Sequence, residues 1–177
     1  MEKFEFTYIA STSDLEDPNL EDRFFEAGCD DATIMVTKGL IAACFVREAE
    51  NYIHAICTAM RDVASAGVTV ERFEPDFLVT QSEIAVRSGM SRQAISLYVK
   101  GARGDSSDPF PNPYALVTSP APLWDWVDVS SWLHKAGKVG HDVPVKAELG
   151  RTVNKFLVGR SKPSDAQANF VRQLEAC

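Results

Sequence analysis

The sequence predicts an α+β protein with two folded units and a helical C-terminal segment. Strand and helix patterns alternate as far as about Pro75, and two short helical patterns joined at Gly89 follow them. Amphipathic helical patterns then occupy the end of the chain. We therefore divide the chain into residues 1–75, 76–134 and 135–177. With 177 residues, 45% of them hydrophobic, the chain is long enough to bury a substantial core.

The first unit has the element order β-α-β-β-α-β. Phe4, Phe6 and Tyr8 alternate with smaller or polar residues, as in a half-buried strand. The later elements are expected at 20–27 (helix), 32–36 and 40–46 (a hairpin turning at Lys38-Gly39), 49–66 (helix) and 68–73 (strand). This order predicts a ferredoxin-like arrangement, in which two helices cover one face of an antiparallel sheet.

The polar residues of the first unit form no recognisable catalytic set. Cys29, Asp30 and Asp31 lie together at an expected turn, where a reactive thiol or a metal-binding pair of carboxylates is the functional alternative. No histidine accompanies them, so we interpret them as a solvated turn, and Arg47 as a solvated charge. The four cysteines and three histidines have no zinc-motif spacing. We therefore expect no metal, no cofactor and no enzymatic activity.

The second unit begins with signals for two short helices joined by a tight turn. Thr80 and Glu83 have the spacing of a capping box, and Ser91 is placed to cap the second helix. Gly89 lies where a helix ends in a left-handed residue, a conformation that costs glycine little. Small Ala85 allows the two helices to cross closely, so the sequence predicts a helix-turn-helix.

The outward face of the second helix favours contact with DNA. Arg92, Gln93, Ser96 and Lys100 are expected on this face. Arginine can bond guanine and glutamine can bond adenine through two hydrogen bonds each in the major groove. No acidic residue occurs from Ile84 to Gly104, although the whole chain is acidic. The alternative is an ordinary helical hairpin with a solvated outer face.

The spacing of Gln81, Ala85, Gly89, Ser91 and Ile95 resembles that of bacterial helix-turn-helix regulators. Beyond the second helix come an FPNP loop, strand patterns at 115–118 and 123–126, and a short helix that we expect Asp128 to cap. Over residues 77–133 the chain therefore resembles the winged-helix regulators of the excisionase and MerR type.

This resemblance implies that the second helix enters the major groove. The implied DNA-contacting residues are Gln81, Ser91, Arg92, Gln93, Ser96, Lys100 and, on the approach to the wing, Arg103. The expected wing tip at 118–122 departs from the family because it has no arginine or lysine. We interpret the three tryptophans (Trp124, Trp126, Trp132) as core residues, with stacking on bases as the alternative.

Charge is distributed unevenly along the chain. The net charge of −7 divides into −9 for residues 1–75, −2 for 76–133 and +4 for 134–177. We expect the acidic first unit to be held away from DNA. The C-terminal segment has two helical patterns, an apolar stripe over 145–157 and a capping box at Ser164 and Gln167. These helices either pack on their own domain, pair with another subunit, or contact phosphates through Lys146, Arg151, Lys155, Arg160 and Lys162.

Together these patterns predict a sequence-specific transcriptional regulator, a repressor of bacterial or phage type that binds double-stranded DNA as a homodimer. The alternative is an antitoxin-like or adaptor protein that binds another protein through its acidic first unit. No apolar run reaches membrane-spanning length, and the N-terminus lacks a basic region followed by an apolar stretch. We therefore expect a cytoplasmic protein with no membrane partner.

Overall fold

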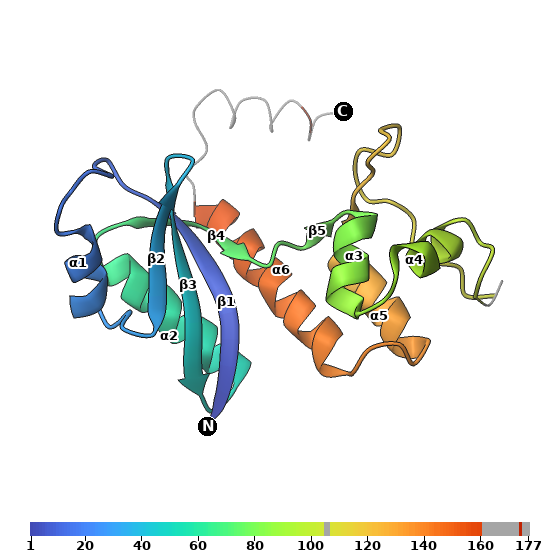
Figure 1. Cartoon of the computed structure of the whole chain (residues 1–177), viewed down its shortest axis with the longest axis horizontal. Helices are drawn as coiled ribbons and strands as arrows, with labels where there is room; N and C mark the ends of the chain where they lie inside the picture. The colour runs from blue at the N-terminus through green and yellow to red at the C-terminus, as the bar shows by residue number, and fades with distance from the viewer. Residues whose placement is uncertain (105–106, 161–173, 175–177) are drawn as a thin grey trace.

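The computed structural model describes residues 1–104, 107–160 and 174. They form an α+β fold in which a four-stranded antiparallel sheet and a helix-rich unit lie side by side (Figure 1). The helices are α1 (Leu20–Glu26), α2 (Tyr52–Ser65), α3 (Gln81–Ser88), α4 (Arg92–Val99), α5 (Trp126–Lys135) and α6 (Asp142–Arg160). The strands are β1 (Glu2–Ser11), β2 (Ala32–Thr37), β3 (Leu40–Ala49), β4 (Thr69–Glu74), β5 (Leu78–Val79) and β6 (Trp124–Asp125).

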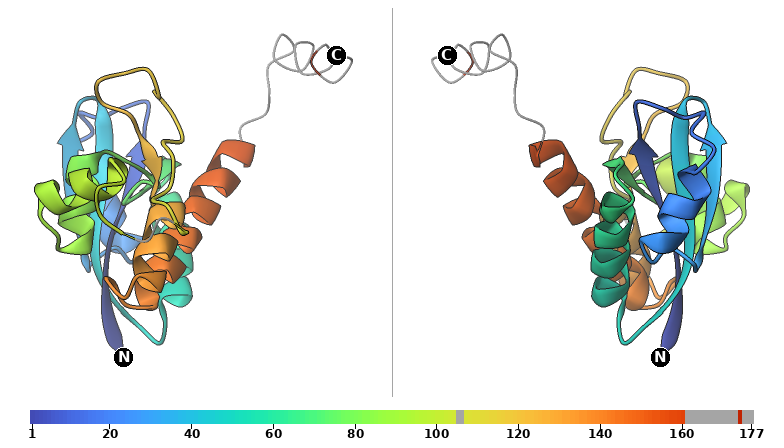
Figure 2. Two further views of the ribbon diagram at one scale, coloured as in Figure 1. Left: turned by 90° about the vertical axis from the view of Figure 1, so that its right-hand side faces the viewer. Right: turned by 90° about the vertical axis from the view of Figure 1, so that its left-hand side faces the viewer.

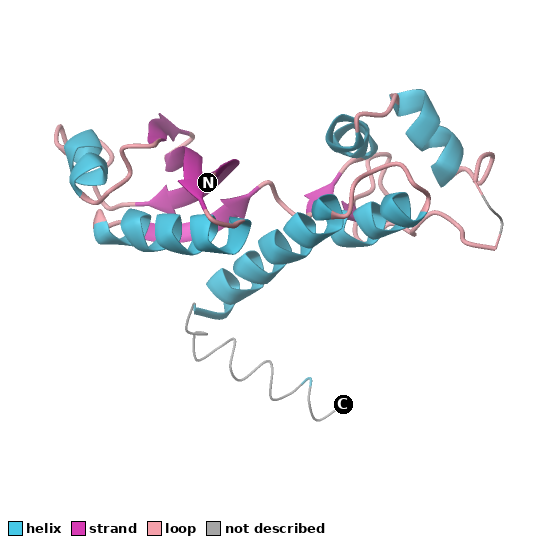
Figure 3. Ribbon diagram, turned by 90° about the horizontal axis from the view of Figure 1, so that it is seen from below, coloured by secondary structure: helices cyan, strands magenta, loops and turns pink. Residues whose placement is uncertain are grey.

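The sheet has the strand order β2-β3-β1-β4, with every neighbouring pair antiparallel. The alternating residues predicted for the first strand all point to one face, where Phe4, Phe6 and Tyr8 are buried. The long helix α2 covers that face, and α1 packs against α2 (Figure 3). The buried Tyr8 hydroxyl donates a hydrogen bond to the Ile56 carbonyl at 2.8 Å, which ties the sheet to α2.

The second unit has its own core, built on the tryptophans. Trp124, Trp126 and Trp132 are only 1%, 5% and 7% exposed, which confirms that they are core residues. They pack with Ile84, Ala85, Ile95 and Leu133 from α3, α4 and α5. Strand β5, which precedes α3, pairs with β6, which precedes α5. This pairing holds the starts of the two helices together.

Helix α6 connects the two units. Leu149 and Val153 pack against the core of the first unit, whereas Val143 and Ala147 pack against the core of the second. Figure 2 shows α6 running alongside α5 and on past the sheet. The predicted apolar stripe is only partly correct, since Val145 and Phe156 are 44% and 53% exposed. The capping box expected at Ser164 and Gln167 lies outside the described residues.

The segment expected to form the wing is less regular than the sequence predicts. Instead of a two-stranded hairpin, a single bridge joins Ala115 to Leu123. Trp124 and Asp125 pair with β5, and Trp126 already belongs to α5. The expected cap at Asp128 is also wrong, because Asp125 performs this role: its carboxylate accepts a hydrogen bond from the Val127 amide at 2.8 Å.

Within the described part of the chain, no helix combines the length and the apolar character needed to cross a membrane.

Candidate nucleic-acid interface

The turn between α3 and α4 is built as the local sequence predicts. The Thr80 amide donates to the Glu83 carboxylate at 2.7 Å, and the Glu83 amide donates to the Thr80 hydroxyl at 3.3 Å. This capping box fixes the start of α3. Gly89 ends the helix with φ of 67°, in the left-handed region. The Ser91 hydroxyl accepts a hydrogen bond from the Ala94 amide at 3.1 Å and so caps α4.

The inner face of α4 is fixed by aromatic contacts. Ile95 is fully buried, and Tyr98 is 4% exposed. The Tyr98 ring lies 5.0 Å from the Trp132 ring, nearly edge-on, and stacks on Phe110 at 6.4 Å. The Trp132 indole in turn donates a hydrogen bond to the Asp108 carbonyl. The orientation of α4 is therefore set by the core of the second unit, and its opposite face is left to solvent.

Most of the residues predicted to contact DNA lie on that solvent face. Arg92, Gln93 and Lys100 are exposed along α4 and its C-terminal cap. Ser96 is half-buried between them. Ser91 is exposed, but its hydroxyl is engaged in the cap. Arg92 and Gln93 lie in the first turn of α4, and Ser96 and Lys100 continue the same outer face toward its C-terminal cap.

The remaining two predicted residues lie to either side of α4. The exposed Arg103 places its guanidinium 5.3 Å from the centre of the Tyr98 ring, just beyond the end of the helix. Gln81 is half-buried in the first turn of α3. The structure thus groups Arg92, Gln93, Ser96 and Lys100, whereas Gln81 lies on a different helix.

The segment from Ser107 to Leu123 adds apolar surface and no basic side chain. Tyr114, Leu116 and Val117 are 65%, 58% and 64% exposed. Leu116 has a φ of 52°, a backbone conformation unusual for a leucine. Because the segment contains no lysine or arginine, it offers no positive charge to a phosphate backbone.

A third arginine near this unit, Arg87, serves the fold. Its guanidinium donates a hydrogen bond to the Asp76 carbonyl at 2.6 Å and lies 5.7 Å from the centre of the Trp126 ring. Burial lowers the pKa of this guanidinium from its ordinary value. Nothing in the spacing of the sequence distinguishes Arg87 from the exposed Arg92, because the partners that bury it lie 11 and 39 residues away.

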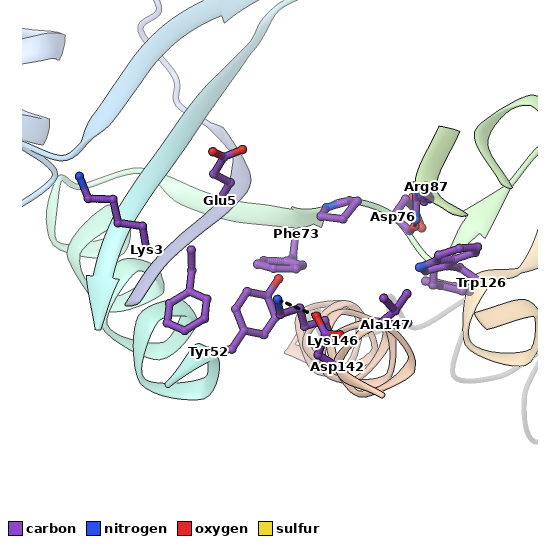
Figure 4. Close-up of a pocket in the computed structure, with 14 residues that line it drawn as sticks. Lys3, Glu5, Tyr52, Phe73, Asp76, Arg87, Trp126, Asp142, Lys146 and Ala147 are labelled. Carbon is purple, nitrogen blue, oxygen red and sulfur yellow. Dashed lines mark hydrogen bonds and ion pairs between the residues drawn. The ribbon is translucent and has the colours of Figure 1, made fainter. Parts of the chain in front are cut away.

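A cleft of about 460 Å³ lies between the sheet and the second unit (Figure 4). Aromatic side chains from both units line it, among them Tyr52, Phe73 and Trp126. Lys146 lies over the Tyr52 ring at 5.8 Å and pairs with Asp142 at 3.2 Å. Burial raises the pKa of Tyr52 to about 12. The sequence does not predict this cleft, because residues from both units and from α6 meet there only in the folded chain.

In the first unit, Arg47 is a buried arginine, although the sequence predicts a solvated charge there. Arg47 is 7% exposed and binds both carboxylate oxygens of Asp31 at 2.8 Å. It also bonds Asp62 at 2.7 Å and the Gly28 carbonyl at 3.0 Å. The interpretations of Arg47 as a solvated charge and of Asp31 as a solvated turn acid are therefore wrong. Burial desolvates this guanidinium, and its ion pairs with the two carboxylates offset part of that cost.

The neighbouring Cys29 is buried at 3% exposure. Burial, with the Asp62 carboxylate as a smaller cause, raises the pKa of this thiol to about 11. A thiol with this pKa is a poor nucleophile at neutral pH. Within residues 1–104, 107–160 and 174, no group of three or more histidine, cysteine or acidic side chains is placed to hold a metal ion.

Comparisons of the chain with protein-family models, curated proteins and solved structures give no match.

Proposed function

We propose that the protein is a sequence-specific DNA-binding transcriptional regulator, a repressor, with α4 as its recognition helix. The observation that carries this proposal is the outer face of α4. Arg92, Gln93 and Lys100 are exposed there, next to Ser96, while Ile95 and Tyr98 hold the opposite face in the core. The donors suited to guanine and adenine edges are thus presented on a rigidly anchored helix.

The proposal includes two finer assignments of fold. For the first unit, the strand order β2-β3-β1-β4 with two helices over one face supports a ferredoxin-like arrangement. For residues 77–133, the pairing of β5 with β6 and the loop bridged at Ala115 and Leu123 support a winged helix-turn-helix with an irregular wing.

A single copy offers few contacts to phosphates. Arg92, Lys100 and Arg103 are the exposed cations of α4 and the turn after it. Each contact to a phosphate contributes modestly and is weakened by salt. Two copies on a palindromic site double the contacts, so we propose that the protein acts as a homodimer.

The second candidate function is that of an adaptor that binds another protein. Its support is the sheet face opposite α2, where Met35 and Val46 are both 49% exposed within a unit that carries a net charge of −9. The two functions are compatible, since the recognition helix and this sheet face belong to different units.

The decisive experiment is a binding titration of the full chain with DNA from upstream of its own gene. It is run at two salt concentrations, with unrelated DNA of the same length as competitor. We expect selective binding that weakens as salt rises. If the two DNAs bind equally at low salt, α4 is not a recognition helix and the DNA-binding proposal falls. Co-purification of a stoichiometric protein partner through residues 1–75 would then favour the adaptor.

A further inference from the structure

The two edges of the four-stranded sheet are treated differently. At the β4 edge, the Asn154 side chain from α6 accepts a hydrogen bond from the Phe73 amide at 2.8 Å and donates one to the Phe73 carbonyl at 2.9 Å. These are the groups that a further strand would need. The strand also carries Glu71, Arg72 and Glu74, and its register with β1 shifts at Ile9 and Ala10. Charges, irregular register and a covering element are the means by which proteins block edge pairing.

The β2 edge has none of these protections. Its sequence, ATIMVT, contains no charge and no proline. Its register with β3 runs without a shift from Ala32 to Thr37. Met35 and Val36 are 49% and 51% exposed, and the strand ends in the Lys38-Gly39 turn. A regular, uncharged, exposed edge strand is a template for pairing with another strand.

The register identifies which backbone groups of β2 face outward. The Val46 amide donates a hydrogen bond to the Asp31 carbonyl at 3.1 Å, so Asp31 directs its backbone groups toward β3. In an antiparallel ladder this direction alternates along the strand. Thr33 and Met35 therefore face β3, while the amides and carbonyls of Ile34 and Val36 face outward. Within the described residues, no hydrogen bond occupies these outward groups.

From this geometry we propose that two copies of the chain pair through their β2 edges, antiparallel, with Ile34 opposite Ile34. A twofold axis perpendicular to the sheet then passes between the two isoleucines. In this register the outward groups of each Ile34 bond to each other, and the Val36 amide of each copy reaches the Ala32 carbonyl of the other. The two sheets become one continuous sheet.

The charges at the ends of β2 fit the same register. When Ile34 opposes itself, the Lys38-Gly39 turn of one copy lies beside the turn that precedes Ala32 in the other, so Lys38 comes near Asp30, and both residues are exposed. The pairing therefore places opposite charges together at both ends of an uncharged strand. This matters because the first unit carries a net charge of −9, so most other approaches of two copies would bring carboxylates together.

The interface also sets where the two recognition helices lie, a consequence that rests on the proposed function. Figure 1 shows β4 on the side of the sheet next to α6 and the second unit, and β2 on the far side. Pairing at β2 places the two helix-turn-helix units at opposite ends of the dimer. We therefore expect half-sites separated by several helical turns of DNA, or two separate sites bridged by one dimer.

The first test measures the oligomeric state of the full chain by sedimentation across micromolar concentrations. Wild type is expected to be a dimer at about 100 μM, since a six-residue strand buries little area and the pairing is of modest affinity. Val36→Pro removes an outward amide and should leave a monomer, whereas Val36→Thr keeps the amide and should leave a dimer. Circular dichroism and thermal unfolding confirm that the variants fold. A monomeric wild type, or a folded Val36→Pro dimer, overturns the proposal.

The second test examines the register by charge exchange. Lys38→Glu and Asp30→Lys each place like charges opposite one another twice per dimer, and each should raise the dissociation constant roughly tenfold. Combining them in one chain restores opposite charges and should return the constant to near the wild-type value. If the effects of the two substitutions on the dissociation constant add in the double variant, the proposed pairing of Ile34 with Ile34 is wrong. Both tests measure dimerisation in the absence of DNA. If the protein dimerises through β2 but does not bind DNA, the proposed function is wrong and the proposed interface is still supported.

Discussion

Arg151 of α6 binds Asp125, the residue that caps α5. One Asp125 carboxylate oxygen accepts a hydrogen bond from the Val127 amide, and the other accepts one from the Arg151 guanidinium at 2.9 Å. Asp125 is 5% exposed, so this ion pair is largely removed from water. Arg151 is also one of the five C-terminal basic residues that the sequence offers for contact with phosphates. Its guanidinium instead connects α6 to the start of α5.

We expect Arg151→Ala to lower the free energy of unfolding by about 2 kcal/mol, because it leaves the buried Asp125 carboxylate with one partner fewer. Lys155→Ala, an exposed position on the same helix, is the control and should change it by less than about 0.5 kcal/mol. Urea unfolding followed by tryptophan fluorescence measures both. If the two substitutions lower the free energy of unfolding equally, the ion pair of Arg151 with Asp125 makes no specific contribution to stability.

Arg47 and Arg61 provide a matched comparison, because both bond to Asp62. The Arg61 side chain is 74% exposed and the Arg47 side chain 9%. Arg47→Ala leaves Asp31 and Asp62 without their shared cation, so we expect a loss of about 3–5 kcal/mol or failure to fold at 37 °C. Arg61→Ala should cost less than about 1 kcal/mol, since exposed pairs contribute little. Thermal unfolding of the two variants distinguishes these outcomes, and similar midpoints would contradict the prediction.

The proposed reading of bases by Arg92 is tested by Arg92→Ala. Loss of a two-bond contact to guanine should weaken specific binding by about 1–3 kcal/mol and relax base preference at one position of the site. Arg61→Ala, which removes an exposed arginine from the first unit, is the charge-matched control and should leave affinity unchanged. The measurement is a titration against the selected DNA and its single-base variants. Unchanged affinity for Arg92→Ala would remove this residue from the readout.

The capping box at the start of α3 predicts a specific pH dependence. The Thr80 amide, bonded to the Glu83 carboxylate, lowers the pKa of Glu83 below its ordinary 4.5. The carboxylate therefore stabilises the folded state above pH 4.5, and this contribution disappears as the pH falls through the lowered value. We expect Glu83→Gln to reduce stability by about 0.5 kcal/mol at pH 7, a small figure because the site is largely solvated.

Urea unfolding of wild type and Glu83→Gln at pH 7 and at about pH 3 measures this effect. The difference between the two proteins in free energy of unfolding should be smaller at the lower pH than at pH 7. A difference that is equally large there would mean that the carboxylate charge is not the source of the stabilisation.

Local signals in the sequence determined most of the secondary structure and the turn of the candidate site. The alternation of Phe4, Phe6 and Tyr8 predicted β1 and its buried face, and the structure confirms both. The capping residues Thr80, Glu83 and Ser91 lie where the sequence placed them, because a cap depends on side chains and amides within three residues of one another. The exposed face of α4 follows from the helical period and the positions of Ile95 and Tyr98.

Tertiary structure alone decided which arginines are held by partners far along the chain and which strands pair. Arg47, Arg87 and Arg151 are each bound by at least one group 11 to 39 residues away, and no local signal in the sequence marks them out from Arg92. Likewise, Leu123 and the residues after it had the pattern of a hairpin strand, but Trp124 and Asp125 pair with β5 instead. The residues next to an arginine or an edge strand in the sequence do not determine whether it faces water or binds a distant part of the chain. That choice depends on desolvation and on hydrogen bonds formed only when separate parts of the chain meet.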